Sequence, residues 1–369
     1  MTKINSAKQR DKIKKKKEKT KMKEMKKIFK QNKKIQDKNP LNSQNFSVPD
    51  KTQIKRFGKK DLSLLILISK RPKRSTINAM IDEARGYFSK TLVVNVDKIH
   101  IQTSDQGIGL FYKGQNLLAY DVIFPRFSSN DFLLAEAVLK AIEFSNAYCP
   151  IGIKAYQITN HKYFTSQELN NEGIPGILTT LFISPKYSKL AVKETGYPFV
   201  MKLISGFAGK GVVLIRDPSQ MNSILDAVHL FEEFICTQQF VKSKKPGTDV
   251  RCYVIGKYIL TVKRTSAKGD WRSNLSRGGT ANLVNATPEM IDAAKRTAKV
   301  LGADLCAVDM MDKNGKWVVI EANFMPGPFM KYLGNMVVHE WMNFLYKKGR
   351  QKKKQNQKKI EKELAEKIV

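Results

Sequence analysis

Apolar and polar positions between residues 61 and 155 alternate in blocks that predict strands followed by helices. The predicted elements are strands at 62–69, 92–96 and 119–127, helices at 75–88 and 129–146, and a hairpin edge at 107–114. The strands are short and almost continuously apolar, whereas the helix at 129–146 repeats its apolar residues at helical spacing. This block therefore predicts an α/β unit in which helices cover a small sheet.

From about residue 160 onward, strand patterns outnumber helical ones. The predicted elements are a helix that stops at Gly173-Ile174-Pro175, a strand–glycine loop–strand at 197–215, a hairpin at 251–264, a helix at 288–301 and a last strand at 317–324. These elements predict an α+β arrangement for the second part of the chain. With 369 residues in total, and about 150 residues per domain as a prior, the chain is expected to form two or three compact units.

Charge is concentrated at the two ends of the chain. The 66 Lys and Arg residues exceed the 33 Asp and Glu residues, which gives a net charge of +33. Residues 1–60 hold 22 basic and 5 acidic residues, and residues 347–369 hold 10 and 3. These basic tails are interpreted either as disordered, solvated arms or as anchors for a polyanion, with RNA favoured over an anionic membrane. A helix within the first tail is an alternative.

Composition excludes several classes of protein. No apolar run approaches the roughly 20 residues that a membrane span needs, and no apolar stretch follows the lysine-rich amino terminus as in a secretory signal. The four cysteines are scattered without a CxxC pair, which argues against zinc ribbons and disulfide frameworks. We expect reduced thiols, a cytoplasmic location and no membrane partner.

A glycine-rich loop follows a strand that carries Lys202. Its glycines, Gly206, Gly209 and Gly211, allow backbone N–H groups to close over phosphate oxygens, and Lys202 can add a positive charge. A strand follows the loop where a Walker A or dinucleotide motif would start a helix. Gly-rich hairpin turns are common, so the loop alone does not identify a nucleotide site.

Three oxygen ligands fall on two neighbouring strands. Glu321 and Asn323 are two residues apart in one strand and so face the same side, and Asp309 lies in the preceding apolar run. The turn signal at 313–316 predicts that the two runs pair as a hairpin. Carboxylate and amide oxygens beside a triphosphate suit Mg²⁺. Solvent-facing acids are the alternative, but ionised acids within apolar runs are costly to bury without a cation.

Arginines mark two further places. The loop at 263–282 holds Arg264, Arg272 and Arg277 with Asn274, which suggests recognition of phosphoryl or carboxylate oxygens. A basic RNA-binding loop or a solvated loop is the alternative, and the loop alone does not decide between them. Arg126 stands at the end of the predicted strand 119–127, where ligands of such sheets bind. Arg126 is interpreted either as part of a surface salt bridge or as a clamp for a substrate carboxylate.

The order of these pieces resembles the ATP-grasp enzymes, and more narrowly the RimK-type amino-acid ligases, which include glutamate ligases. The segments that carry the resemblance are YDVIFPR, NHKYFTSQELNNEGIPG, VMKLISGFAGKGV, DVRCYVIG, GDWRSNLSRGG, AVDMM and IEANFMPG. They cover roughly 61–340 in order and without large gaps. The resemblance implies an ATP-grasp fold with an amino-terminal α/β domain (61–155), a central subdomain with the lid loop (156–235), a carboxy-terminal subdomain with the Mg site (236–346) and flanking basic tails (1–60, 347–369).

The resemblance also implies a role for each matching residue. The nucleotide would be held by Lys162, Lys202, the loop Gly206–Gly211, the hinge residues Gln238, Gln239, Phe240 and Val241, and Asp249 at the ribose. Two Mg²⁺ ions, with Mn²⁺ as an alternative, would bind Asp309, Glu321 and Asn323. Arg272 and Asn274 would act at the reacting groups with Arg264, and Arg126 and Arg251 would contact substrate. His161, Phe207 and Gln239 depart from the usual Asp, small residue and Glu of the family.

Three functions are compatible with these features. The first is an ATP-dependent carboxylate–amine ligase that adds glutamate, or a similar amino acid, to a carboxylate of a protein or peptide such as a ribosomal protein. It would act through an acylphosphate, with RNA or ribosome contacts through the tails. The second is a ligase of the same fold that acts on a small coenzyme or carrier. The third is a catalytically retired RNA- or ribosome-binding protein. Homo-oligomers are common among proteins of this type.

Overall fold

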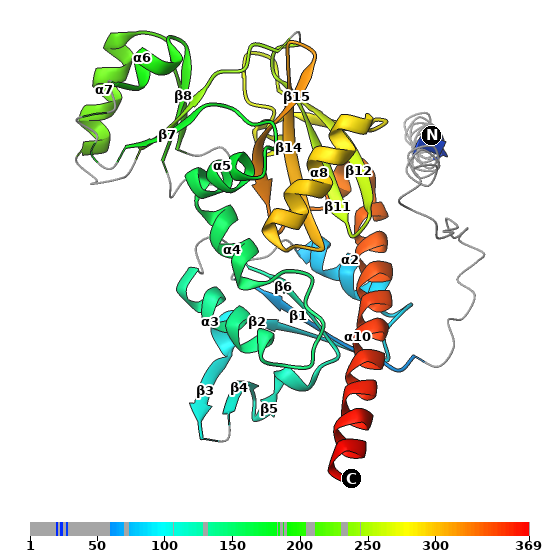
Figure 1. Cartoon of the computed structure of the whole chain (residues 1–369). Helices are drawn as coiled ribbons and strands as arrows, with labels where there is room; N and C mark the ends of the chain where they lie inside the picture. Colours follow the sequence, from blue (N-terminus) through cyan, green and yellow to red (C-terminus); the bar gives the residue numbers. More distant parts are fainter. Residues whose placement is uncertain are drawn as a thin grey trace, which may run out of the picture.

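The computed structural model describes residues 60–69, 74–105, 107–127, 132–182, 184, 187, 190–203, 211–229, 235–243 and 245–368, together with positions 20, 23, 24, 27 and 28. The amino-terminal tail therefore lies almost wholly outside the described residues, as do Gly206 and Gly209 of the glycine loop. Figure 1 shows the arrangement of the elements, with the amino-terminal sheet below and the two larger sheets above it.

The amino-terminal part is built on a parallel sheet. Its central strand β1 (Ser63–Ile68) pairs with β2 (Lys90–Asn95) on one side and β6 (Val122–Arg126) on the other. In β1, Leu65 and Leu67 join one hydrophobic cluster, while Leu64 and Ile66 join another. Successive side chains of a strand point to opposite faces, so a sheet covered on both faces needs the unbroken apolar run seen in the sequence.

Helices cover both faces of this sheet. The helix α2 (Arg74–Ala84) contributes Met80 and Ala84 to the cluster that contains Leu64, and α3 (Phe132–Glu143) contributes Val138 and Leu139 to the opposite cluster. A second, antiparallel sheet projects from this part, with β4 (Gly107–Tyr112) between β3 (His100–Ser104) and β5 (Gln115–Asn116). The strand β3 was not predicted because its residues are mostly exposed and polar.

The middle of the chain forms helices and an antiparallel sheet. The helices α4 (Ile153–Asn160) and α5 (Lys162–Asn171) lead into the strand order β7-β10-β8-β9. The bounds are β7 (Thr179–Phe182), β8 (Phe199–Leu203), β9 (Val212–Ile215) and β10 (Ile235–Gln239), with α6 (Ala191–Thr195) and α7 (Pro218–His229) alongside. The predicted strand–loop–strand at 197–215 is confirmed as the antiparallel pair β8 and β9.

The last part contains the largest sheet, in the antiparallel order β13-β12-β11-β14-β15. Its strands are β11 (Thr248–Ile255), β12 (Tyr258–Thr265), β13 (Thr280–Leu283), β14 (Leu305–Lys313) and β15 (Lys316–Asn323), with the helices α8 (Pro288–Leu301) and α9 (Met330–Leu333). Short 3₁₀ turns lie at η2 (Val96–Lys98), η3 (Leu117–Ala119) and η6 (Leu275–Arg277). The predicted hairpin of β14 and β15 is confirmed, with Asn314 (φ 55°) and Gly315 (φ 87°) in its turn.

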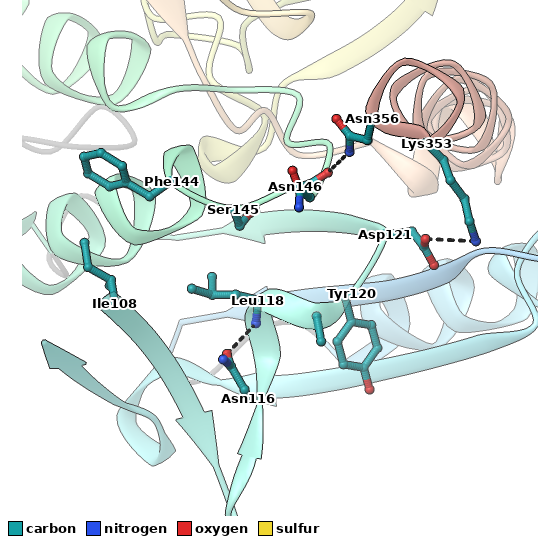
Figure 2. Close-up of a pocket in the computed structure, with 11 residues that line it drawn as sticks. Ile108, Asn116, Leu118, Tyr120, Asp121, Phe144, Ser145, Asn146, Lys353 and Asn356 are labelled. Carbon is teal, nitrogen blue, oxygen red and sulfur yellow. Dashed lines mark hydrogen bonds and ion pairs between the residues drawn. The ribbon is translucent and has the colours of Figure 1, made fainter. Parts of the chain in front are cut away.

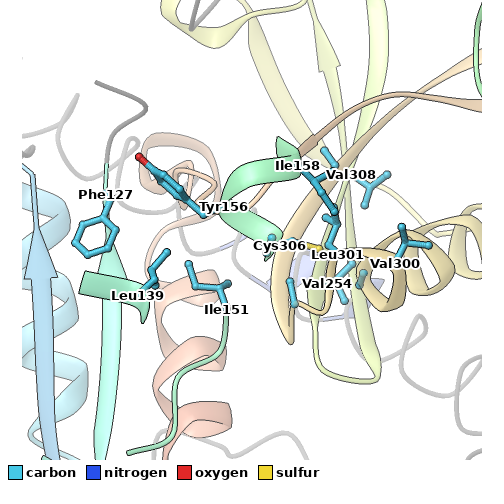
Figure 3. Packing of buried hydrophobic residues seen from close by; sticks show 14 of the residues in the cluster. Phe127, Leu139, Ile151, Tyr156, Ile158, Val254, Val300, Leu301, Cys306 and Val308 are labelled. Atoms are coloured by element: carbon cyan, nitrogen blue, oxygen red, sulfur yellow. The ribbon is translucent and has the colours of Figure 1, made fainter. Parts of the chain in front are cut away.

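The core runs without interruption from the amino-terminal part into the last sheet. Phe127, Leu139 and Tyr156 belong to the same buried cluster as Leu301 and Val308 (Figure 3). Because this apolar surface is shared, α4 and α8 fix the amino-terminal sheet relative to the strands that carry the predicted metal ligands. The mixed α/β architecture predicted from the sequence is confirmed.

The long helix α10 (Met336–Ile368) differs from the expectation for the carboxy-terminal tail. Residues 347–369 were expected to form a disordered, solvated arm or an anchor for a polyanion, but 347–368 are ordered and continue a helix whose first turns bury Trp341 and Leu345. A helix that is already nucleated by packing extends at little further cost, which accounts for the difference. Gly349 lets the helix approach the amino-terminal sheet, since a Cβ there would lie 2.4 Å from Val122 Cγ2. Within the described residues, no helix has the length and hydropathy of a membrane span.

Candidate active site

The strands β14 and β15 present the predicted metal ligands on one face. Asp309 lies directly opposite Glu321, and Asn323 lies opposite Ala307, so the three predicted ligands share a face of the sheet. The register shifts between Asp309 and Met310, and such bulges re-aim side chains next to active sites.

Two lysines from the middle part approach the same region. Lys162 is the first residue of α5, and Lys202 lies on β8 opposite Cys236 of β10. Burial lowers the pKa of Lys162, the charge of Glu321 opposes this shift, and Lys202 adds to it. The two ammonium groups and the carboxylate of Glu321 therefore act on one another electrostatically. Two cations beside an acidic strand can hold the oxygens of a polyphosphate.

His161 stands where the family usually has Asp, and its contacts explain how the chain accommodates this departure. Its side chain caps α5, because Nδ1 accepts a hydrogen bond from the backbone N–H of Phe164 at 3.3 Å. Burial lowers the pKa of His161, which favours the neutral imidazole that can accept this bond. The usual Asp can cap a helix in the same way, so the substitution keeps the helix end and leaves Lys162 in place.

A buried ion network surrounds Asp309. Arg251 donates from Nε and Nη2 to the two oxygens of Asp309, each at 2.7 Å, and Arg264 donates from Nη2 at 2.9 Å. Arg264 also donates from Nε to Asp249 at 2.6 Å, and Ser273 Oγ donates to Asp249. Burial raises the pKa of Asp309, but the two guanidiniums outweigh it and hold the pKa at about 2. The carboxylate is thus kept ionised.

The predicted ligand set fits magnesium. Two carboxylates and one carboxamide are hard oxygen donors, and Mg²⁺ takes few protein ligands when phosphates or waters complete its shell. Among the residues that the structure describes, no group of three or more His, Cys, Asp and Glu gathers as an all-protein metal site would require. Two carboxylates and one carboxamide suit a metal whose shell is completed by polyphosphate oxygens. The number of ions stays a prediction.

Asp270 organises the arginine-rich loop. Its carboxylate accepts from the backbone N–H and Nε of Arg272, both at 3.0 Å, and from Nε of Arg277 at 2.6 Å. Burial raises the pKa of Asp270, but these two arginines lower it far below its usual range. Arg272 Nη1 also donates to the carbonyl of Val212, 3.2 Å away on β9, directly after the glycine loop. Asp270 was not predicted as a site residue, although its spacing of two from Arg272 is that of an Asx turn.

The turn that carries Asn274 depends on two glycines. Asn274 immediately precedes the 3₁₀ turn η6, and Gly278 ends that turn with φ 89°. A Cβ on Gly279 would lie 2.8 Å from the carbonyl oxygen of Thr265. The paired glycines in the sequence are therefore required for close backbone approach as the loop rejoins the sheet.

Arg126 lies where the amino-terminal sheet meets the loop after β15. Its Nη2 donates to the carbonyl of Pro326 at 2.9 Å, and its guanidinium lies 4.9 Å from the ring centroid of Trp341. Burial lowers the pKa of Arg126 to about 10. The surface salt bridge, one of the two interpretations of Arg126, is not found among the described residues. Tyr253 holds the same loop through a hydrogen bond to the carbonyl of Gly327.

The hinge residues have partners that the sequence did not reveal. Gln238 Nε2 donates to Thr179 Oγ1 at 3.2 Å, and Lys313 Nζ donates to Gln239 Oε1 at 2.7 Å. The amide of Gln239 thus keeps an acceptor where the family usually has Glu. Phe240 meets Trp271 edge-on at 6.1 Å, and Val241 is buried. Lys313 and Gln239 are far apart in sequence, so only the fold brings them together.

The glycine loop is described only at its base. Residues 204–210 lie outside the described residues, whereas Gly211 has φ 70°, a conformation that favours glycine. The Leu203 N–H donates to the Gly211 carbonyl at 2.9 Å and closes the neck of the hairpin between β8 and β9. The predicted contacts of Gly206 and Gly209 stay predictions.

Two antiparallel sheets and the start of α5 thus bring two lysines, two carboxylates and an arginine-rich loop to one region, and this arrangement is that of the ATP-grasp class. The family model for the RimK-like ATP-grasp domain matches residues 159–338. A "Probable alpha-L-glutamate ligase" of Maridesulfovibrio salexigens is 34% identical over 264 residues, which is 71% of this chain and 87% of that protein. Its namesake in Hydrogenovibrio crunogenus is 32% identical over 265 residues, 71% and 88% of the two chains.

Solved structures agree on the fold. The ATP-grasp ligase PsnB, determined with minimal precursor, Mg and ADP, gives a TM-score of 0.61 at 17% identity and covers 80% of this chain and 99% of its own. At this identity the likeness shows the fold alone. With the sequence relatives, it establishes that the chain belongs to the RimK-like ATP-grasp family of ADP-forming amino-acid ligases. The family resemblance stated from the sequence is confirmed.

Proposed function

We propose that this ligase adds glutamate, or a similar amino acid, to a carboxylate of a protein or peptide, with a ribosomal protein as the favoured acceptor. The observation that carries the proposal is the convergence of Lys162, Lys202, Asp309 and Glu321 beside the Asp270–Arg272 loop. The names of the sequence relatives support glutamate as the amino acid. PsnB was also solved with a precursor peptide, which favours a peptide acceptor.

The reaction would proceed in two steps. A substrate carboxylate attacks the γ-phosphorus of ATP, which forms an acylphosphate and releases ADP. The amine of the second substrate then attacks the acyl carbon, loses a proton and displaces phosphate, leaving an amide. Mg²⁺, as two ions or with Mn²⁺ in its place, would supply positive charge at the phosphoryl oxygens when bound.

The chain's own residues would hold and neutralise the reacting groups. Lys162 and Lys202 would contact the phosphates, and Arg272 would stabilise the oxyanion that develops at the acyl carbon. Arg272 donates to the carbonyl of Val212 on β9, the strand that follows the predicted lid loop. Asn274 and Arg264 complete the predicted catalytic set, and Asp249 would contact the ribose.

Arg126 is suited to a substrate carboxylate. The buried guanidinium of Arg126 donates to a backbone carbonyl, and no carboxylate among the described residues pairs with it, so its positive charge is not compensated there. A carboxylate bound there would supply the missing counter-ion, next to the loop that follows Asn323. Arg251 is held by Asp309 and would face the same substrate from the other side.

The test is ADP release by the full chain with ATP and Mg²⁺, using single amino acids with and without ribosomal protein, peptide or small acids. An Asp309→Ala/Glu321→Ala variant is the blank, and Glu289→Ala/Asp292→Ala, on the exposed side of α8, is the matched control. Turnover that needs glutamate plus a protein or peptide, and that is lost only in the blank, is the expected result. Light scattering on the same sample measures whether a homo-oligomer forms.

Two other outcomes would contradict this proposal. Equal turnover with glutamate and a small acid alone would favour the coenzyme ligase, and a D-alanine–D-alanine ligase among the structural neighbours shows that the fold also serves small substrates. No turnover under any pairing would favour a retired enzyme whose function is binding. We also propose that the basic ends of the chain contact RNA or the ribosome in the cytoplasm. These ends lie outside the active site, so the ADP-release assay does not test that contact.

A further inference from the structure

A short loop leads from β15 to α9 and is fixed at two consecutive carbonyls. Arg126 Nη2, from the amino-terminal sheet, donates to the carbonyl of Pro326 at 2.9 Å. Tyr253 Oη, from β11, donates to the next carbonyl, that of Gly327. Pro326 and Pro328 are buried, and their rings restrict the backbone on both sides of the glycine. The loop therefore has little conformational freedom before α9 begins.

The residue that precedes α9 has an unusual backbone conformation. Three non-glycine residues of the described chain have a positive φ, namely Lys113 (48°), Asn314 (55°) and Phe329 (49°). Lys113 and Asn314 lie in hairpin turns, where this conformation is ordinary, whereas Phe329 is the N-cap of a helix. For a bulky side chain the conformation is strained and persists only where the surrounding structure holds it. The strain therefore points to a contact that depends on where the Phe329 side chain lies.

That contact is with Arg251. The guanidinium carbon of Arg251 lies 5.1 Å from the centroid of the Phe329 ring, and this ring meets Tyr253 edge-on at 5.8 Å. Nε and Nη2 of the same guanidinium donate to Asp309, so the ring and the carboxylate together fix its plane. Burial raises the pKa of Tyr253, and the charge of Arg251 and a hydrogen bond from it oppose this rise. Arg251, Tyr253 and the loop thus form one connected unit.

We propose that Phe329 is a positioning residue for the substrate carboxylate, because its ring fixes Arg251 and its loop links Arg251 to Arg126. Arg126 is held in a similar way, since its guanidinium lies 4.9 Å from the ring centroid of Trp341 and 5.5 Å from that of Phe124. Each of the two arginines predicted to contact substrate therefore lies against an aromatic ring. This role rests on the proposed function, in which both arginines bind substrate.

A purely structural role for Phe329 would need only apolar volume. The side chain is half-buried and packs against the cluster that contains Val262 and Leu333, and a leucine can fill similar space. A role through Arg251 needs the ring itself, because a cation is attracted by the negative face of the aromatic system. The two roles therefore predict different results for Phe329→Leu and Phe329→Tyr.

The experiment compares both variants of the full chain with the wild type by steady-state kinetics, with KM measured separately for ATP, glutamate and the acceptor. Loss of the partly desolvated ring contact in Phe329→Leu should raise KM for a carboxylate substrate by roughly 5- to 20-fold. KM for ATP should stay nearly unchanged, and Phe329→Tyr should behave as the wild type. If Phe329→Leu does not fold, Phe329→Asn replaces it, because asparagine tolerates this backbone conformation.

Phe144→Leu is the matched control. The ring of Phe144 also lies beside a cation, with Lys140 Nζ 5.3 Å from its centroid. It lines a cavity of about 440 Å³ beside α10, and none of the residues that line this cavity belongs to the loop before α9 (Figure 2). This variant should change none of the three KM values.

Calorimetric titration with glutamate, and with a short peptide that has a free carboxyl end, distinguishes failure of the positioning role from failure of the proposed function. If the wild type binds either probe in the presence of ADP and Mg²⁺ but shows no turnover, weaker binding by Phe329→Leu alone would still support the role. Unchanged KM and binding in Phe329→Leu would overturn it. So would an equal rise in KM for ATP, an equal loss in Phe329→Tyr, or a wild type that binds neither probe.

Discussion

Charged side chains occur in two contrasting arrangements in this molecule, a buried and paired network and an exposed row of cations. Around Asp309, two arginines and two aspartates are buried and joined by hydrogen bonds between 2.5 and 2.9 Å. Along the outer half of α10, four exposed cations recur every fourth residue, and the first three have no carboxylate partner among the described residues: Arg350, Lys354, Lys358 and Lys362. The first set depends on each member, because removing one leaves a buried charge uncompensated. The exposed row acts through its total charge, because water screens each single exposed charge.

This contrast separates two kinds of functional residue. In the buried set, position is determined by the partners, so a substitution should change stability and activity together. In the exposed row, a substitution should leave the fold intact and change only the attraction for a polyanion. The following variants test that distinction, from the largest expected effect to the smallest.

Arg264→Met should have the largest effect. It leaves Asp249 without its guanidinium partner, and breaking a buried pair costs roughly 3–5 kcal/mol of unfolding free energy. Arg85→Met, which breaks an exposed pair with Asp82, should cost at most about 1 kcal/mol. Chemical denaturation of both variants checks the difference. If Arg264→Met does not fold, Arg264→Met/Asp249→Leu should recover a folded chain, and failure of both would contradict the pairing argument.

Asp270→Asn should affect activity more than stability, because its carboxylate is less buried than those of the network and serves Arg272 and Arg277. A misplaced Arg272 should lower kcat by about 10- to 100-fold, which corresponds to roughly 1.4–2.7 kcal/mol of transition-state stabilisation. Steady-state kinetics should show KM for ATP nearly unchanged. Arg277→Gln is the control that keeps the Asp270–Arg272 pair, and an equal loss of kcat there would assign the effect to the loop as a whole.

Gly349→Ala should destabilise the docked half of α10. The added Cβ would meet Val122 Cγ2 at 2.4 Å, and overpacking in a core costs about 1–3 kcal/mol, against about 1 kcal/mol gained from the better helix former. The net loss should be about 1 kcal/mol by thermal or chemical denaturation. Gln355→Ala on the exposed side of the same helix is the control and should be neutral or slightly stabilising.

His339, in the first turn of α10, should make the stability of the contact between α10 and α2 depend on pH. Its Nδ1 lies 3.0 Å from Glu83 Oε2 on α2, and the bond to Glu83 raises its pKa against the effect of burial, with Glu340 adding to the rise. A raised folded pKa gives stability that is complete below the unfolded pKa of about 6.5 and is lost as pH rises through the folded value. His339→Gln should therefore be less stable than the wild type in acid, and the two should converge at alkaline pH. Parallel curves would contradict this assignment.

Some elements and site residues could be predicted from the sequence and others could not, for physical reasons. Local patterns located α8, the hairpin of β14 and β15, and the three ligands on one face, because strand periodicity and turn residues act over a few positions. The partners of Asp309 could not be located, because Arg251 and Arg264 reach it only after β11, β12 and β14 pair. The helical course of 347–368 was missed because like charges disfavour a helix locally, and packing at Trp341 and Gly349 outweighs them.

Lys354→Gln/Lys358→Gln should have the smallest effect on stability. The change removes up to three like-charge contacts at spacing four, each unfavourable by about 0.2–0.5 kcal/mol in an isolated helix and less in salt. Unfolding free energy should therefore stay the same or rise slightly at low ionic strength, and the rise should vanish as salt is added. Denaturation at two salt concentrations measures this directly. A loss of stability comparable to that of Gly349→Ala would mean that these lysines support the fold, and the contrast between the buried network and the exposed row would then fail.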